Sequence, residues 1–181
     1  ATKPFGFMPF RPGPGLGGHC IPIDPFYLTW RAREFGRQTR FIELAGEINT
    51  GMPDYVIGKV IDALNDEGRA VKDSRILLLG LSYKANVDDC RESPALVLME
   101  KLENRGAVVS YNDPNVPVIP ETREHAEFAG RESVSISDDY DLVLLVTDHA
   151  EYHDHDFSDF SSPVVDTRDC LKKRPPKYHK A

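Results

Sequence analysis

A cysteine and a carboxylate lie four residues apart near the start of the chain. Residues 13–25 read GPGLGGHCIPIDP, with Cys20 two positions after a glycine cluster and Asp24 just beyond it. A thiol in this setting could act as a nucleophile, because glycines let the backbone approach a ligand closely and a helix N-terminus favours a thiolate. A lone cysteine is also a common small buried residue, and Asp24 is also a suitable helix N-cap. The residues alone leave both interpretations open.

The same stretch contains a Gly-x-Gly-x-x-Gly string, which is the pattern of a dinucleotide-binding loop. Such a loop needs a buried strand before its first glycine and a helix that starts at its last one. Here the preceding FMPFRP holds two prolines, which argue against a buried strand, and Pro22 is expected to break a helix that begins after Gly18. The context therefore favours a tight loop presenting Cys20 over a dinucleotide site.

Composition narrows the class of protein. The chain has 181 residues and a formal net charge of −7, which argues against a general nucleic-acid binder. Three cysteines without a C-x-x-C pair fit a reducing cytoplasm better than a disulfide framework or a zinc site. No apolar run approaches the length of a membrane span, and no signal-peptide core is evident. The chain starts without methionine, and we expect it to be a fragment that acts in the cytoplasm.

Periodicity divides the chain into a helical part and an α/β part. We expect a close-fitting loop over residues 1–23, a helix from Asp24 to Gly36, and a long helix over 39–67 that Gly51 and Pro53 kink or split. From residue 73, buried strands alternate with helices, which predicts a Rossmann-like parallel sheet. Its strands are expected at 75–80, 107–113, 141–147 and 163–167, with helices at 93–106, capped by Ser93, and near 155–160. The predicted domains are 1–72 and 73–171, followed by a frayed tail, 172–181.

The long helix over 39–67 carries apolar residues on more than one face. A helix of this kind packs either against a partner chain or inside another domain. The first alternative predicts a homodimer through the central helices, and the sequence does not separate the two.

Two long motifs resemble one enzyme family. The cysteine loop PGPGLGGHCIPIDP and the segment GLSYKANVDDCRESPA at 80–95 are similar to the two signatures of the UDP-glucose/GDP-mannose dehydrogenases. The wording GGHCIP is most similar to the branch that acts on UDP-N-acetylglucosamine or UDP-N-acetylmannosamine. The resemblance implies a UDP-sugar substrate and oxidation of the sugar C6 alcohol to a carboxylate with NAD as cofactor. It also implies that the family's N-terminal NAD-binding domain is not part of this chain.

The resemblance also implies catalytic roles. Cys20 would attack the C6 aldehyde and form a thiohemiacetal and then a thioester. Asp24, from the pattern C-x-P-x-D, would orient or deprotonate the hydrolytic water. Lys84 would contact the sugar and stabilise negative charge on oxygen, although a solvated lysine is the alternative. Arg91 would reach the NAD phosphates, or else pair with Asp88 or Asp89.

The substrate would be lined by further residues of the two motifs, and other features are discounted. The loop would contribute Phe10, Arg11, Gly13 and Gly17. Tyr83 would pack on the sugar or uracil or in the core, and Lys3 would serve a partner subunit's ligand.

We interpret DHAEYHDHD at 148–156 as a solvated loop, Cys90 and Cys170 as small fillers, and Trp30 as a core residue. The alternatives are the corresponding part of a UDP-glucose 6-dehydrogenase, or a non-catalytic nucleotide-sugar binding or oligomerisation module.

Overall fold

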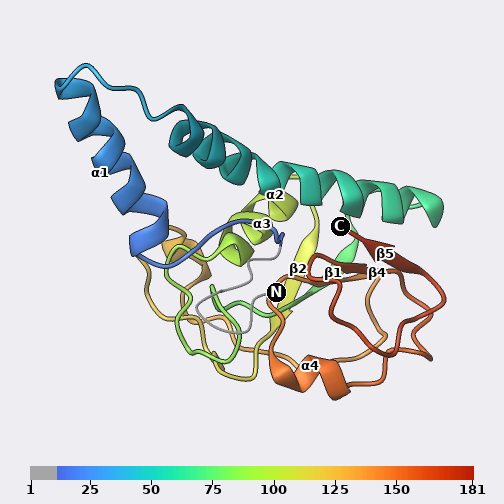
Figure 1. Cartoon of the computed structure of the whole chain (residues 1–181). Helices are drawn as coiled ribbons and strands as arrows, with labels where there is room; N and C mark the ends of the chain where they lie inside the picture. The colour runs from blue at the N-terminus through green and yellow to red at the C-terminus, as the bar shows by residue number, and fades with distance from the viewer. Residues whose placement is uncertain (1–11) are drawn as a thin grey trace, which may run out of the picture.

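A parallel sheet follows a helical hairpin in the chain. The computed structural model describes residues 12–181 (Figure 1). Its elements are α1 (Cys20–Glu34), α2 (Arg40–Asp66), β1 (Arg75–Leu79), α3 (Pro94–Glu103), β2 (Val108–Asn112), a 3-10 turn (Ala126–Phe128), β3 (Leu142–Leu145), α4 (Ala150–Asp154), β4 (Val164–Asp166) and β5 (Tyr178–Lys180). Among residues 12–181, no helix is long and apolar enough to cross a membrane.

The sheet is a doubly covered parallel sheet with the strand order β2-β1-β3-β4-β5. The leucines of β1 are buried on both faces and alternate between two cores. Ile76 and Leu78 join the core under α2 and α3, whereas Leu77 and Leu79 join the core beside α4. This alternation is what a strand buried on both faces requires, and it confirms the predicted α/β class.

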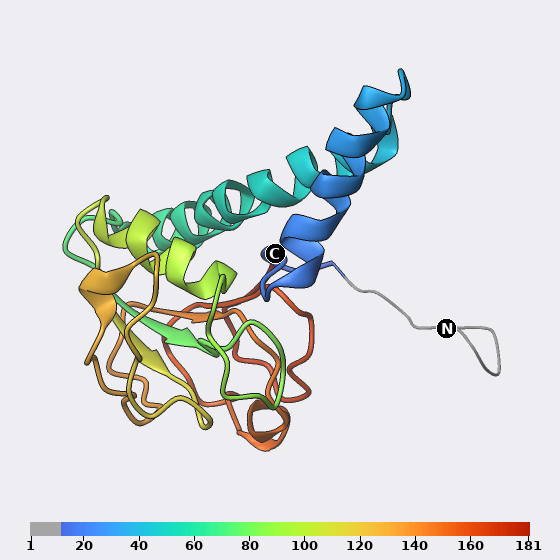
Figure 2. The same ribbon diagram turned by 90° about the vertical axis from the view of Figure 1, so that its left-hand side faces the viewer.

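Helix α2 is one continuous helix and not two. Pro53 lies inside it, and the half that follows buries Val56, Ile57, Val60, Ala63 and Leu64 against the sheet. Their spacing is the apolar stripe of a packed helix. This packing outweighs the single backbone hydrogen bond that Pro53 removes. The first half of α2 pairs with α1, and together they project away from the sheet (Figure 2).

Helix α1 begins at Cys20, four residues before the expected start. Its N-cap is His19, so the expectation that Asp24 caps this helix is wrong. Pro22 is only the third helical residue, where the backbone N–H has no partner within the helix, and it therefore does not break the helix. Half of the argument against a dinucleotide loop fails on this point. The other half concerns FMPFRP at 7–12, of which residues 7–11 lie outside the described residues, so it stays a prediction.

Two expectations about the end of the chain are also wrong. Residues 178–180 form β5, an edge strand paired with β4, where we expected a frayed tail. The Tyr178 hydroxyl donates to Asp166 at 3.0 Å, and Lys180 forms an ion pair of 2.6 Å with Asp169. The short helix near 155–160 is displaced to α4 at 150–154.

Gly80, directly after β1, packs against Thr147, which follows β3, and it offers a test of this packing. Its φ is +86°, and a Cβ there would lie 2.5 Å from the Thr147 carbonyl oxygen. We expect Gly80→Ala to lower the free energy of unfolding by about 2 kcal/mol or more, because it adds backbone strain to a backbone collision. Urea unfolding followed by circular dichroism measures this change.

Gly58→Ala is the matched control, because a Cβ at this helical position meets nothing within 4 Å. It should be neutral or stabilising by up to about 1 kcal/mol. Equal effects of the two substitutions would contradict the proposed packing at Gly80.

Candidate nucleotide-sugar site

The cysteine loop packs directly on the second motif. The Gly18 N–H donates to the Arg91 carbonyl at 3.2 Å. At Gly17 a Cβ would lie 2.6 Å from both the Glu92 carbonyl oxygen and the Tyr83 Cβ, so only glycine fits. Two segments that are far apart in the sequence are therefore held together at the edge of the sheet.

Cys20 and Asp24 lie on α1, immediately after this contact. Cys20 is the first helical residue, and both side chains are exposed. Residues four apart on a helix lie on the same face, so the thiol and the carboxylate point to the same side of α1. The expected pair of nucleophile and carboxylate is thus geometrically available to a ligand at the start of the helix.

Tyr83 and Lys84 follow β1 at the carboxyl end of the sheet, where α/β folds bind ligands. Tyr83 is half-buried, and its ring lies beside Gly18. Lys84 is exposed, and within residues 12–181 its ammonium makes no ion pair. It is therefore available to a negatively charged group.

Arg91 forms the salt bridge that was the alternative to a cofactor contact. Its Nη2 lies 2.6 Å from Asp89 Oδ2, and Nε also donates to this carboxylate, at 3.0 Å to Oδ1. The hydrogen bond from Arg91 lowers the pKa of Asp89. The Arg91 side chain is 74% exposed, so it remains accessible to a ligand.

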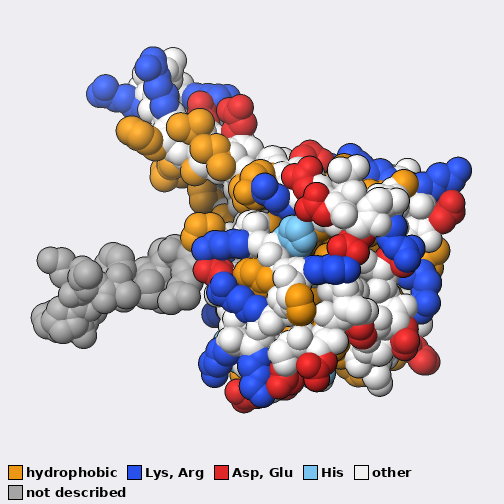
Figure 3. Space-filling view, turned by 90° about the vertical axis from the view of Figure 1, so that its right-hand side faces the viewer, with side chains coloured by type: hydrophobic (Ala, Val, Ile, Leu, Met, Phe, Trp, Pro, Cys, Tyr) orange, Lys and Arg blue, Asp and Glu red, His pale blue; other side chains and the backbone are white. Residues whose placement is uncertain are grey.

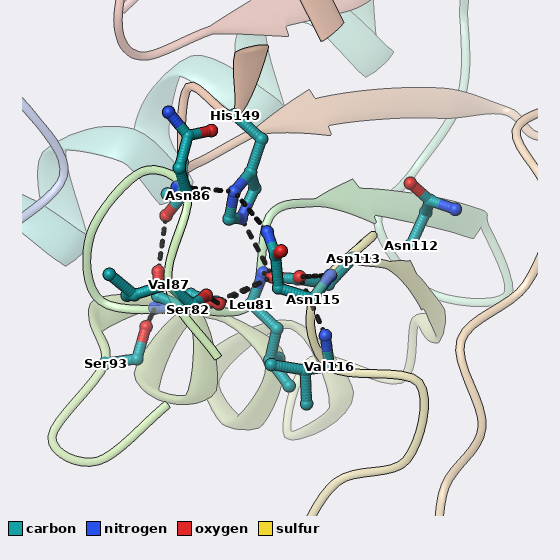
Figure 4. A network of polar contacts seen from close by, with 12 residues as sticks. Leu81, Ser82, Asn86, Val87, Ser93, Asn112, Asp113, Asn115, Val116 and His149 are labelled. Atoms are coloured by element: carbon teal, nitrogen blue, oxygen red, sulfur yellow. Dashed lines mark hydrogen bonds and ion pairs between the residues drawn. The ribbon is translucent and has the colours of Figure 1, made fainter. Parts of the chain in front are cut away.

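A buried carboxylate, Asp113, joins the ends of three strands (Figure 4). Its Oδ2 accepts from Leu81 N at 2.7 Å and Ser82 N at 2.9 Å, and Ser82 Oγ lies 3.0 Å from it. Its Oδ1 accepts from Asn115 N at 2.8 Å and Val116 N at 3.0 Å. Burial by itself raises the pKa of Asp113, but the hydrogen bonds from His149, Ser82 and Asn115 outweigh it and lower the pKa to about 2.

His149 completes this cluster and is fully buried. Its Nε2 lies 3.0 Å from Asp113 Oδ2, and its Nδ1 lies 2.9 Å from the Asn86 backbone nitrogen. A backbone N–H can only donate, so Nδ1 must accept and the proton must be on Nε2. The imidazole is therefore neutral and bridges Asn86 to Asp113.

A hollow of about 310 Å³ lies beside the cysteine loop. It is lined by Gly18, His19 and Ile23 together with residues 91–93, Leu96, Val97 and 121–125. Neither Cys20 nor Lys84 lines it, so it is adjacent to the predicted reaction site and does not coincide with it.

Comparison with known proteins identifies the chain. Residues 77–173 match the UDP binding domain of the UDP-glucose/GDP-mannose dehydrogenase family, and residues 1–51 match that family's central domain. The chain belongs to the UDP-glucose/GDP-mannose dehydrogenase family. This confirms the resemblance, and the two matched domains fall on the two segments that meet at Gly17 and Gly18.

Several similar members of the family are named as dehydrogenases of N-acetylated sugars. The NDP-N-acetyl-D-galactosaminuronic acid dehydrogenase of Ralstonia nicotianae is 36% identical over 160 residues, which cover 87% of this chain and 36% of the relative. A UDP-N-acetyl-D-mannosamine dehydrogenase of Methanococcus maripaludis is 38% identical over 139 residues, or 77% of this chain and 30% of the relative. The chain spans about a third of the length of these curated relatives.

The fold agrees with solved structures of this family. The UDP-D-ManNAc dehydrogenase of Pyrococcus horikoshii superposes with a TM-score of 0.78 at 27% identity, covering 94% of this chain and 40% of that one. This likeness confirms the Rossmann-like architecture.

Several site residues escaped the sequence analysis or lie outside the structure. Phe10, Arg11 and Lys3 fall outside the described residues, so their predicted roles stay predictions. The interpretation of 148–156 as a solvated loop is wrong, because His149 and Tyr152 are buried there. Trp30 is 60% exposed and is not a core residue. Cys90 is buried as expected, and burial raises the pKa of its thiol.

Arg168 is a further cation at this edge of the sheet. Its Nε donates to the Val146 carbonyl at 2.8 Å, and its guanidinium would collide with a Cβ at Gly13. Burial lowers its pKa. It follows β4, just as Lys84 follows β1 and His149 follows β3. The sequence signal that could have identified Arg168 is its position directly after a predicted parallel strand.

The Asp113 cluster predicts how stability depends on pH. Asp113 has a pKa of about 2 in the folded protein, against about 3.9 in an unfolded chain. Its stabilisation is therefore complete above about pH 4 and is lost as the pH falls towards about 2, by about 2 kcal/mol in all. Urea unfolding at a series of pH values should show the difference between wild type and Asp113→Asn shrinking over this window. Parallel curves for the two proteins would contradict the assignment.

Proposed function

We propose that this chain supplies the nucleotide-sugar site and the reactive cysteine of an NAD-dependent UDP-N-acetylhexosamine 6-dehydrogenase. The reaction oxidises the sugar C6 alcohol to a carboxylate. The observation that carries the proposal is the packing of the cysteine loop on the segment that bears Tyr83 and Lys84. The match to a UDP binding domain and the names of the relatives support the choice of substrate class.

The substrate would lie where the loop meets the carboxyl end of the sheet. Gly13 and Gly17 would offer backbone to the ligand, and Tyr83 would pack on the sugar or the uracil. Lys84 and Arg168 supply positive charge at the ends of β1 and β4, which suits an anionic diphosphate sugar. In a chain of net charge −7, such local cations are what an anionic ligand requires.

Cys20 and Asp24 would perform the covalent chemistry. The Cys20 thiolate would form a bond to C6 of the aldehyde, and Lys84 would stabilise the resulting oxyanion. After C6 has reached the oxidation level of a thioester, Asp24 would take a proton from the water that attacks C6 and displaces the thiolate. Both side chains are exposed at the start of α1, on the side where a ligand could reach them.

Arg91 is the main residue of this chain that would contact NAD. After β1 the chain reads Gly-Leu-Ser-Tyr-Lys, with one glycine only, so this turn lacks the repeated glycines of a pyrophosphate-binding loop. Arg91 fits a phosphate contact, since its side chain is mostly exposed. When bound, NAD accepts the hydride that leaves C6.

The helical hairpin would pair with a second copy of the chain. Large apolar side chains are exposed along α1 and the first half of α2, and Figure 3 shows hydrophobic side chains gathered on this projection. They include Tyr27, Trp30, Phe35, Phe41, Leu44 and Ile48. A patch of this kind on a projecting element is typical of an interface.

The ligand test uses thermal unfolding of this chain with UDP, UDP-N-acetylglucosamine, UDP-glucose and NAD. A ligand that binds only the folded state raises the melting temperature with its concentration. We expect the UDP compounds to stabilise the chain and NAD to have little effect. Lys84→Ala should weaken UDP-N-acetylglucosamine about tenfold, because a charged hydrogen bond is lost. Lys72→Ala, an exposed lysine before β1, is the matched control and should leave binding unchanged.

Stabilisation by NAD alone would contradict the proposal and return the glycine loop to the dinucleotide class. No stabilisation by any UDP compound would mean that this chain does not form the site.

The dimer is tested by light scattering. We expect the chain to be dimeric, and Phe41→Asp, which places a charge where the side chain is 88% exposed, to make it monomeric. A monomeric wild type would contradict the proposed interface.

A further inference from the structure

Lys84 lies in a short arch that closes on itself. The arch spans residues 82–89 and begins three residues after the last residue of β1. The Ser82 hydroxyl donates to the Val87 carbonyl at 2.7 Å, and the Tyr83 N–H donates to the Asp89 carbonyl at 2.9 Å. Lys84 and Ala85 therefore project from a loop whose two sides are hydrogen-bonded to each other.

The first foot of the arch is fixed at Ser82. Its N–H donates to Asp113 Oδ2 at 2.9 Å, and its carbonyl accepts from Thr147 Oγ1 at 2.7 Å. Its hydroxyl oxygen also lies 3.0 Å from Asp113 Oδ2. Asp113 follows β2 and Thr147 follows β3, so this foot is tied to both neighbouring strands.

The second foot is fixed at Asn86. Its N–H donates to His149 Nδ1 at 2.9 Å, and its side-chain oxygen accepts from Ala150 N at 3.0 Å. Asn86 has a φ of +60°, a left-handed conformation that asparagine tolerates better than most residues. The imidazole of His149 is thus the piece that joins the second foot to Asp113, which also holds the first foot (Figure 4).

We propose that His149 and Asp113 are positioning residues that hold Lys84 in place for the sugar. This rests on the proposed function, since it assigns a purpose to Lys84 at that site. His149 acts through Asn86, and the atom that matters is the Nδ1 acceptor. Neither residue needs to touch the substrate, because both are buried beneath the arch.

Two substitutions separate the acceptor from the donor of His149. In asparagine the side-chain oxygen can take the place of Nδ1, so His149→Asn keeps an acceptor for the Asn86 N–H and loses the contact with Asp113. In glutamine the terminal amide reaches the place of Nε2, so His149→Gln keeps a donor for Asp113 and loses the acceptor for Asn86. Both substitutions replace a buried ring by a smaller polar group, so a general structural effect should be similar in the two.

The experiment measures affinity for UDP-N-acetylglucosamine by calorimetry on the whole chain. We expect His149→Gln to bind about tenfold more weakly and His149→Asn to stay within about threefold of wild type, at comparable melting temperatures. Asp138→Asn is the control for destabilisation, because Asp138 accepts from Ser161 and Ser162 ahead of β4, at the other end of the sheet. It should leave affinity unchanged. Equal losses in the two His149 variants, or no loss in either, would overturn the proposal.

Hydrogen exchange separates this proposal from the proposed function. Amide exchange over residues 83–86 should speed up in His149→Gln, remain slow in His149→Asn, and stay unchanged in β1 in both. If the wild type binds no UDP-sugar, the proposed function fails. The positioning of the arch is still supported in that case if exchange over residues 83–86 stays slow in His149→Asn and becomes fast in His149→Gln. Equal exchange rates over residues 83–86 in the wild type and both His149 variants would overturn the positioning role of His149.

A measurement on the wild type covers the case in which the variants do not fold. With ¹⁵N labelling, we expect a scalar coupling across the hydrogen bond between the Asn86 nitrogen and His149 Nδ1, together with the chemical shift of an unprotonated Nδ1. A protonated Nδ1 would overturn the proposal directly.

Discussion

One buried carboxylate determines how the carboxyl end of this sheet is built. Asp113 has no exposed side-chain surface, and its two oxygens accept hydrogen bonds from Leu81, Ser82, Asn115, Val116 and His149. A charge in that position is tolerated only because every lone pair meets a donor. The donors come from the segments after β1, β2 and β3. Those segments must therefore keep a fixed arrangement for the fold to be stable, and the residues that face a ligand follow from that arrangement.

The cysteine loop reaches this rigid edge from a separate part of the chain. It contacts the edge at Gly17, where a Cβ would collide with the Glu92 carbonyl oxygen, and at Gly18, where it would collide with the Tyr83 ring. These close contacts leave the loop little freedom where it meets the start of α1. The site consequently combines a thiol on a helix with cations after parallel strands. The exposed apolar surface lies on α1 and the first half of α2, whereas the second half of α2 packs on the sheet.

The strands and the sheet class were predictable from the sequence because they depend on local pattern. The ILLL run of β1 and the Ser93-Pro94 start of α3 each carry their own signal, an apolar run and a side-chain cap, and the structure has both. The start of α1 was missed because Pro22 was weighed as a helix breaker, although a proline in the first turn removes no hydrogen bond. β5 was missed because it is a short edge strand within a lysine-rich end of the chain, which looks like a solvated tail. Its stability comes from pairing with β4 and from Asp166 and Asp169.

The buried His149 was beyond the reach of local pattern. In the sequence it stands among histidines and acids that suggest solvent, and only the topology brings it next to Asp113, 36 residues away. The predicted site residues that the structure describes divide in a similar way. Gly17 and Tyr83 meet directly, whereas the relation of Cys20 and Lys84 to a substrate depends on the ligand itself.

A crystal structure of this chain with UDP-N-acetylglucosamine is the most direct test of a single site shared by the two motifs. The account predicts the sugar between the start of α1 and the arch, with C6 facing Cys20, Lys84 on a sugar oxygen and the diphosphate near Arg168. A ligand bound elsewhere, with Cys20 and Lys84 both free of it, would contradict the account.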